Sequence, residues 1–161
     1  MNLILSCPFG TVVSNKKGSG FLAFPEELYA FLEEIYEKAT FKISIKTRIG
    51  KDSPEEFEKI LEIYNQYPIE ELTIHPRIQT DFYKNTPNLD VYEYAYKNSK
   101  NPICYNGDIH SVNSYQIFAE RFSGKYAYKF VEINRNCAIL INSDCRRFVL
   151  QLKKQWKTIF L

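Results

Sequence analysis

The first 122 residues alternate four times between a short apolar run and an amphipathic helical segment. The repeat is roughly 30 residues long, which is the spacing of strand–helix units in a parallel sheet. The predicted strands are residues 2–6, 41–46, 72–75 and 102–105. The predicted helices begin at Pro25 and at Ser53–Pro54 and cover 89–96 and 111–122. This alternation predicts an α/β fold with a parallel sheet and helices packed against it.

Two architectures use such units: an open doubly wound sheet and the (β/α)8 barrel of roughly 250 residues. The 161 residues could form a complete open sheet or about half a barrel, and four units fit either. In both architectures functional groups lie at the carboxyl ends of the strands. Polar or reactive residues follow each predicted strand: Cys7-Pro8, Lys46 and Arg48, His75 and Arg77, and Asn106-Gly107-Asp108. We therefore expect one site at this edge of the sheet.

Each of these residues also has a purely structural interpretation. A lone cysteine such as Cys7 packs like a small hydrophobe, and a histidine such as His75 at a strand end is often a satisfied structural residue. Lys46 could extend its ammonium to solvent, although burial on a covered strand would require an anion. Asn106-Gly107 alone is a turn signal, and the glycine-rich segment 18–20 alone is weak evidence for phosphate binding.

Composition narrows the class of protein. With 45% hydrophobic and 25% charged residues and a net charge of +2, the chain has enough apolar material for a core. No apolar run is long enough to span a membrane, and residues 1–7 lack a basic flank and a cleavage site, so we expect a cytoplasmic protein. The four cysteines form no CxxC pair, which predicts free thiols and no metal site.

Charge changes sign near residue 121. Residues 1–120 carry 12 basic and 17 acidic side chains, whereas residues 121–161 carry 9 basic and 2 acidic ones. All seven prolines lie before this point. We therefore divide the chain into a first unit, 1–122, and a divergent basic segment, 123–161. That segment is a solvated tail, a nucleic-acid-binding tail or an ending translated out of register.

The motifs in combination resemble the tRNA-dihydrouridine synthases. These motifs are Cys7-Pro8 with the following KKGSG loop, KxRxG from Lys46 to Gly50, HxR from His75 to Arg77 with Tyr83 downstream, and NGDI from Asn106 to Ile109. Their order and spacing match the family over about residues 2–122. The resemblance implies a partial (β/α)8 TIM-type barrel of about four units, and a truncated member of the family.

The family resemblance also implies chemistry. It implies an FMN-dependent reductase that uses NADPH or NADH to convert tRNA uridine to 5,6-dihydrouridine, with Cys7 as the acid that protonates C5. It assigns flavin contacts to Lys46, His75, Arg77 and the turn Asn106-Gly107-Asp108. The tRNA backbone would contact Lys16 and Lys17.

The sequence departs from the family pattern at several points. Ile4 and Ser6 stand where the family usually has Asn and Gly, the first two barrel strands are absent, and no glycine-arginine phosphate motif follows residue 124. Two alternatives therefore remain: a non-catalytic RNA-binding or inert fragment, and another FMN-dependent barrel oxidoreductase. A half barrel would also leave two unpaired sheet edges, which predicts self-association.

Overall fold

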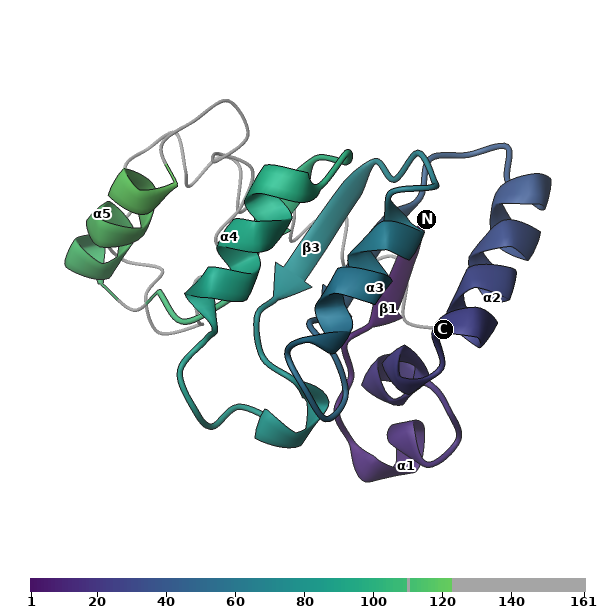
Figure 1. Ribbon diagram of the computed structural model, residues 1–161, viewed down its shortest axis with the longest axis horizontal. Helices are drawn as coiled ribbons and strands as arrows, with labels where there is room; N and C mark the ends of the chain where they lie inside the picture. The colour runs from purple at the N-terminus through teal and green to yellow at the C-terminus, as the bar shows by residue number, and fades with distance from the viewer. Residues whose placement is uncertain (110, 123–161) are drawn as a thin grey trace.

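Four parallel strands form a single sheet in the order β1-β2-β3-β4 (Figure 1). The computed structural model describes residues 1–109 and 111–122, so the expectations for Cys137, Cys145 and the segment 123–161 lie outside the described residues. The strands are β1 (Asn2–Leu5), β2 (Ser44–Arg48), β3 (Glu71–His75) and β4 (Ile103–Tyr105). The parallel pairs place Asn2 opposite Ser44, Ser44 opposite Glu71, and Leu72 opposite Ile103.

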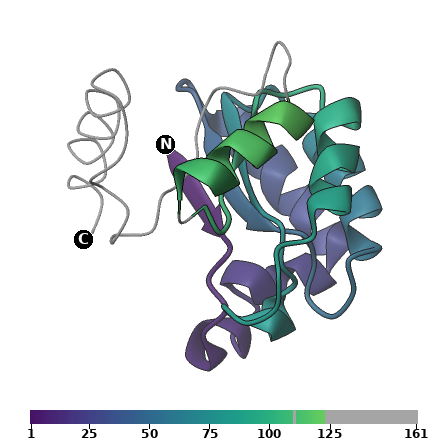
Figure 2. The ribbon, with the colours of Figure 1, turned by 90° about the vertical axis from the view of Figure 1, so that its left-hand side faces the viewer.

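A helix connects each strand to the next. These helices are α2 (Pro25–Lys38), α3 (Glu56–Tyr64) and α4 (Leu89–Asn98), and α5 (Val112–Arg121) follows β4. Helices α3 and α4 lie on the same side of the sheet (Figures 1 and 2). A doubly wound sheet would reverse its strand order and carry helices on both faces, whereas a (β/α)8 barrel keeps sequential order and places helices outside. The fold is therefore that of a partial barrel, as predicted.

The side chains of each strand point alternately to a face that the helices cover and to a face that they leave open. Ile45 and Ile74 are almost completely buried under the helices, and the buried Tyr64 hydroxyl of α3 donates to Thr47 Oγ1 at 3.0 Å. Because successive side chains of a strand point to opposite faces, Lys46 and Thr73 lie on the open face. The open face corresponds to the interior of a complete barrel.

The predicted strand 41–46 is wrong at both ends. Pairing begins at Ser44, opposite Asn2 at the start of β1, and continues to Arg48. Alternation of apolar and polar residues does not reveal where a neighbouring strand starts to supply hydrogen bonds. Lys46 and Arg48 consequently lie within the strand rather than after it.

The long connection after β1 contains two short helices that the sequence pattern did not predict. They are α1 (Gly10–Val13) and the 3-10 helix η1 (Gly18–Ala23). Residues Gly18 to Gly20 and Leu22 of η1 are buried. The glycine-rich segment is therefore packed inside the protein rather than presented to solvent. No helix in residues 1–109 and 111–122 is long and apolar enough to cross a membrane.

Helix α5 packs beside β4 and α4 through aromatic contacts. The rings of Tyr105 and Phe118 have centroids 4.3 Å apart, and those of Tyr92 and Phe122 lie 5.1 Å apart at a nearly perpendicular angle. Ring pairs at such distances add attraction beyond the area that they bury. This cluster joins α4, β4 and α5 into one unit.

Within the described residues, β1 and β4 are the outer strands of the sheet. An outer strand presents backbone groups that can pair with another chain. Self-association through these edges remains a prediction.

Candidate functional site

The carboxyl ends of the four strands bring the predicted site segments together. Cys7 follows β1, Lys46 lies on the open face of β2, and His75 ends β3. The segment that follows β4 joins the same edge, because the backbone N–H of Asn106 donates to the Ile74 carbonyl at 2.9 Å. The predicted gathering of these segments is therefore confirmed, whereas their chemical roles remain predictions.

The backbone around Cys7 is held at three successive carbonyl groups. Arg48 Nε donates to the Ser6 carbonyl at 3.0 Å. The backbone N–H and the hydroxyl of Ser19 donate to the Cys7 carbonyl at 3.0 and 2.8 Å. Gln79 Nε2 donates to the Pro8 carbonyl at 3.3 Å. The Cys7 side chain, which is partly exposed, is thus presented on a fixed backbone.

Gly18 is required where η1 meets the cysteine segment. Its φ of +54° is a conformation that other residues seldom adopt, and an added Cβ would lie 2.7 Å from the Cys7 carbonyl oxygen. The KKGSG loop therefore packs against Cys7 directly. No phosphate role is needed to account for its glycines.

We expect Gly18→Ala to lower the free energy of unfolding by about 2 kcal/mol, because it adds both left-handed backbone strain and a steric clash. Gly10→Ala is the matched control, since a Cβ at Gly10 would meet nothing within 4 Å. That control should change stability by less than about 0.5 kcal/mol. Urea denaturation of both variants measures the difference, and equal stabilities would contradict the close packing at Gly18.

Arg48 joins the cysteine segment to the loop after β3. Besides Ser6, its guanidinium donates to the carbonyls of Ile78 at 2.8 Å and Phe82 at 2.6 Å. These two residues flank the 3-10 helix η2 (Gln79–Asp81). The Arg48 side chain is only 1% exposed, and its guanidinium carbon lies 5.5 Å from the centre of the Tyr83 ring. Burial lowers the pKa of Arg48.

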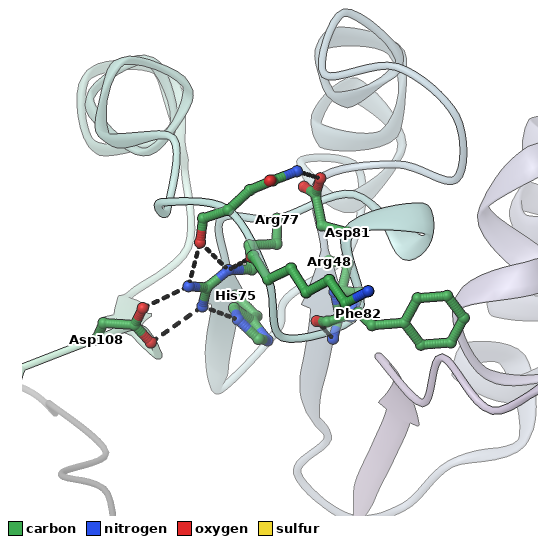
Figure 3. Close-up of polar contacts among 8 residues, drawn as sticks. Arg48, His75, Arg77, Asp81, Phe82 and Asp108 are labelled. Atoms are coloured by element: carbon green, nitrogen blue, oxygen red, sulfur yellow. Dashed lines mark hydrogen bonds and ion pairs between the residues drawn. The ribbon is translucent and has the colours of Figure 1, made fainter.

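Arg77 is the second buried arginine of the site. Its guanidinium faces His75 on one side and Asp108 on the other (Figure 3). Nη1 lies 3.1 Å from His75 Nε2 and 3.0 Å from Asp108 Oδ1, and Nη2 forms an ion pair with the other carboxylate oxygen of Asp108. The remaining contacts are to the carbonyls of Lys84 and Asn85. Arg77 thus connects β3, the loop after it and the turn after β4.

His75 is held as a neutral imidazole. Its pKa is lowered from 6.5 to about 3, chiefly because burial disfavours the charged ring. Nearby cations add to the effect, in the order Arg48, Arg77 and Lys46, while Asp108 opposes it. These influences also show that Lys46 is close enough to act electrostatically on His75.

This low pKa predicts a loss of stability in mild acid. The unfolded chain protonates His75 near pH 6.5, whereas the folded chain does so only near pH 3, so the unfolded state binds the proton first. The stability that this group contributes is complete above about pH 6.5 and is lost as the pH falls toward 3. Between pH 7 and pH 5 we expect its share of the loss to be on the order of 1–2 kcal/mol.

Urea titrations at pH 7 and pH 5 measure that loss. His75→Gln keeps an acceptor for Arg77 but cannot titrate, so its stability should change less over the same interval. Carboxylate titration affects both proteins alike and cancels in the comparison. An equal decrease in the two proteins would contradict the burial of a neutral His75.

The turn Asn106-Gly107-Asp108 is shaped by a neighbouring side chain. A Cβ added to Gly107 would lie only 2.2 Å from the Tyr105 hydroxyl oxygen. The absence of a side chain at Gly107 therefore leaves room for Tyr105. Burial, followed by the charge of Asp108, raises the pKa of Tyr105 to about 12.

The two predicted RNA-contacting lysines differ in their surroundings. Lys16 Nζ forms an ion pair with Glu27 at 2.8 Å and lies 4.3 Å from the centre of the Phe24 ring. Lys17 is exposed beside it. Lys17 is therefore the better candidate for contact with a phosphate backbone, and both roles remain predictions.

Sequence patterns gave no role to three residues that hold the cysteine segment. Arg48 was noted only at a strand end, Ser19 only as part of the KKGSG loop, and Gln79 not at all. A usable signal existed for Arg48, because an arginine among buried strand residues needs several acceptors. Ser19 and Gln79 act on backbone atoms that are distant in sequence, and no local pattern reveals such contacts.

Comparison with known proteins agrees with the motifs. The dihydrouridine synthase (Dus) family matches residues 1–123. The tRNA-dihydrouridine(16) synthase of Vibrio vulnificus is 28% identical over 112 residues, which are 68% of this chain and 35% of that protein. The tRNA-dihydrouridine synthase B of Pasteurella multocida is 28% identical over 114 residues, or 70% of this chain and 34% of the relative.

The chain therefore spans about a third of the length of these curated relatives. The matched region contains the whole described sheet and the residues gathered at its carboxyl edge. Since the family matches most of the chain, this protein belongs to the dihydrouridine synthase family.

Proposed function

We propose that this chain carries part of the active site of a flavin-dependent tRNA-dihydrouridine synthase. The observation that supports this most strongly is the placement of three residues: Cys7 follows β1, His75 ends β3, and Lys46 on the open face of β2 is close enough to His75 to lower its pKa. The relatives are named as synthases of dihydrouridine in tRNA. We expect such a reaction to take place in the cytoplasm.

The open face suits a flavin by the chemistry of its groups. Lys46 would place a cation beside the ring system, where it favours a negatively charged reduced state. The neutral imidazole of His75 lies close enough to Lys46 to feel its charge. Arg77 and the turn Asn106-Gly107-Asp108 border the same area, at the edge where barrel enzymes bind phosphate groups. Lys46, His75 and the turn would hold FMN from β2, β3 and the segment after β4, and Arg77 would support them by its contacts with His75 and Asp108.

The reaction adds a hydride to C6 of uracil and a proton to C5. Bound FMN would supply the hydride, with NADPH or NADH as the source of the two electrons. The Cys7 thiol would give its proton to C5, and solvent would restore that proton afterwards. Hydrogen bonds to the Ser6 and Cys7 carbonyls hold the backbone from which this thiol extends. A uridine turned out of the RNA stack would present its π-face and its edge to this site.

The first test is whether the purified chain retains FMN. We expect a visible flavin absorption band after excess FMN is removed, and we expect Lys46→Met to weaken binding by at least tenfold because a charge-assisted contact is lost. Lys42→Met is the matched control, since Lys42 is exposed and pairs with Glu70 outside the site.

Four outcomes are informative. Retained flavin with dependence on Lys46 supports the proposal. Binding that is equally weakened by Lys42→Met would indicate only general charge attraction, and it would contradict the assigned site. A chain that binds tRNA but no flavin would favour the RNA-binding alternative, and flavin binding without tRNA affinity would favour another flavin oxidoreductase.

A further inference from the structure

The contacts of Arg77 determine which nitrogen of His75 carries the proton. An arginine side chain has five N–H donors and no acceptor. The contact between Arg77 Nη1 and His75 Nε2, 3.1 Å long, can therefore be a hydrogen bond only if Nε2 accepts. In a neutral imidazole one nitrogen accepts and the other carries the hydrogen. The hydrogen of His75 must then be on Nδ1.

Arg77 is itself held firmly enough to fix this arrangement. Its Nε donates to the Lys84 carbonyl at 2.8 Å, and Nη2 donates to the Asn85 carbonyl at 2.6 Å. Both terminal nitrogens also contact the Asp108 carboxylate. Each guanidinium nitrogen is thus engaged within the protein, and the side chain is only 3% exposed. Arg77 has little capacity left to bind a ligand directly.

The Nδ1 atom of His75 has a different environment. Within the described residues the structure records a hydrogen bond only at Nε2 of this ring. In the same part of the chain, the one fully buried polar side-chain atom without a partner is the Tyr36 hydroxyl. The Nδ1–H group is therefore not sealed in the core. It lies at the end of β3 on the open face, on the same face as Thr73.

We propose that Arg77 is a positioning residue that locks His75 as the Nδ1–H tautomer, so that His75 offers a neutral hydrogen-bond donor to an acceptor atom on the open face. The acceptor class is a carbonyl oxygen or an unprotonated ring nitrogen, such as those of a flavin. The choice of a flavin as the acceptor rests on the function proposed above. The low pKa of His75 supports it, because the ring remains neutral throughout the physiological range.

The proposal is tested by nitrogen NMR on the purified, flavin-free chain. The sequence contains two histidines, so a 15N-labelled protein made without a histidine tag gives two ring systems, and His110→Gln assigns them. We expect His75 to show a protonated nitrogen at Nδ1 and an unprotonated nitrogen at Nε2 at pH 7. A protonated Nε2 in the wild-type chain would overturn the proposal without any variant.

Two substitutions separate the Arg77 contact from general disturbance of the network. Arg77→Met removes the donor to Nε2, so we expect a mixture of tautomers or a shift of the proton to Nε2. Asp108→Asn weakens the ion pair but leaves the contact between Arg77 and His75, so the Nδ1–H tautomer should persist. An unchanged tautomer in Arg77→Met would show that something other than Arg77 sets it.

Addition of FMN then separates this inference from the proposed function. If flavin binds, we expect the Nδ1 resonance of His75 to move, and binding seen by absorption without such movement would contradict the donor role. If no flavin binds, the proposed function fails, while the tautomer results alone decide whether Arg77 positions His75.

Discussion

Replacing Arg48 with methionine should lower the free energy of unfolding by about 3–5 kcal/mol, since it removes from a buried site the charged donor to three carbonyl groups. The carbonyls of Ser6, Ile78 and Phe82 would lose their charged partner at distances of 2.6–3.0 Å. Methionine roughly fills the space of the alkyl part, so the loss reflects hydrogen bonding more than a cavity. Chemical denaturation at pH 7 measures it.

A matched arginine outside the site controls for the loss of a positive charge. Arg121 pairs with Asp90 and Glu93 on the surface, where an exposed ion pair contributes less than about 1 kcal/mol. Arg121→Met should therefore cost far less than Arg48→Met. Arg48→Lys should recover only part of the stability, because one ammonium cannot reach three acceptors in the planar guanidinium geometry. Equal effects at positions 48 and 121 would contradict the role of Arg48 in holding the cysteine segment.

The strand–helix order was predictable from the sequence because each element follows a local rule. The helix from Pro25 has proline in its first turn and an apolar stripe, and it was found from Pro25 to Lys38. Strand β3 was predicted at 72–75 and runs from Glu71 to His75. Strand β2 was misplaced because its limits depend on where β1 begins. The choice between a barrel and an open sheet likewise required the strand order, which no local pattern contains.

The sequence predicts which strand ends form the candidate site, but it does not predict the hydrogen bonds that connect their side chains. Parallel strands must bring their carboxyl ends together, so His75 and Asn106 were placed correctly from the sequence. The hydrogen bonds of Arg77 to Lys84 and Asn85 depend on the path of a loop. That path includes two residues with positive φ, Phe82 and Asn85, and neither is marked by a glycine. The role of Arg77 as a connector therefore emerged only from the structure.

Replacing Cys7 with alanine should reduce the rate of tRNA uridine reduction by about 100- to 10,000-fold, the range expected when a general acid is removed. The effect should fall on the chemical step. Ser19 and Arg48 contact backbone carbonyls, so the alanine variant keeps every bond that holds the segment. Flavin retention and the free energy of unfolding should therefore remain close to the wild-type values. The assay is single-turnover reduction of tRNA uridine by the FMN-loaded chain with NADPH.

Isotope labelling distinguishes a missing proton donor from a displaced substrate. In D2O the wild-type product should carry deuterium at C5, because the thiol proton exchanges with solvent. The N5 hydrogen of reduced flavin exchanges as well, so deuterium at C6 is not diagnostic. If Cys7 is the acid, the solvent isotope effect on the chemical step should differ between the wild type and Cys7→Ala. Cys104→Ala is the matched control, since Cys104 is a buried cysteine of β4 and should leave the isotope effect intact. A Cys7→Ala rate within threefold of wild type would contradict the acid role, because the fixed backbone would then hold a thiol that the reaction does not use.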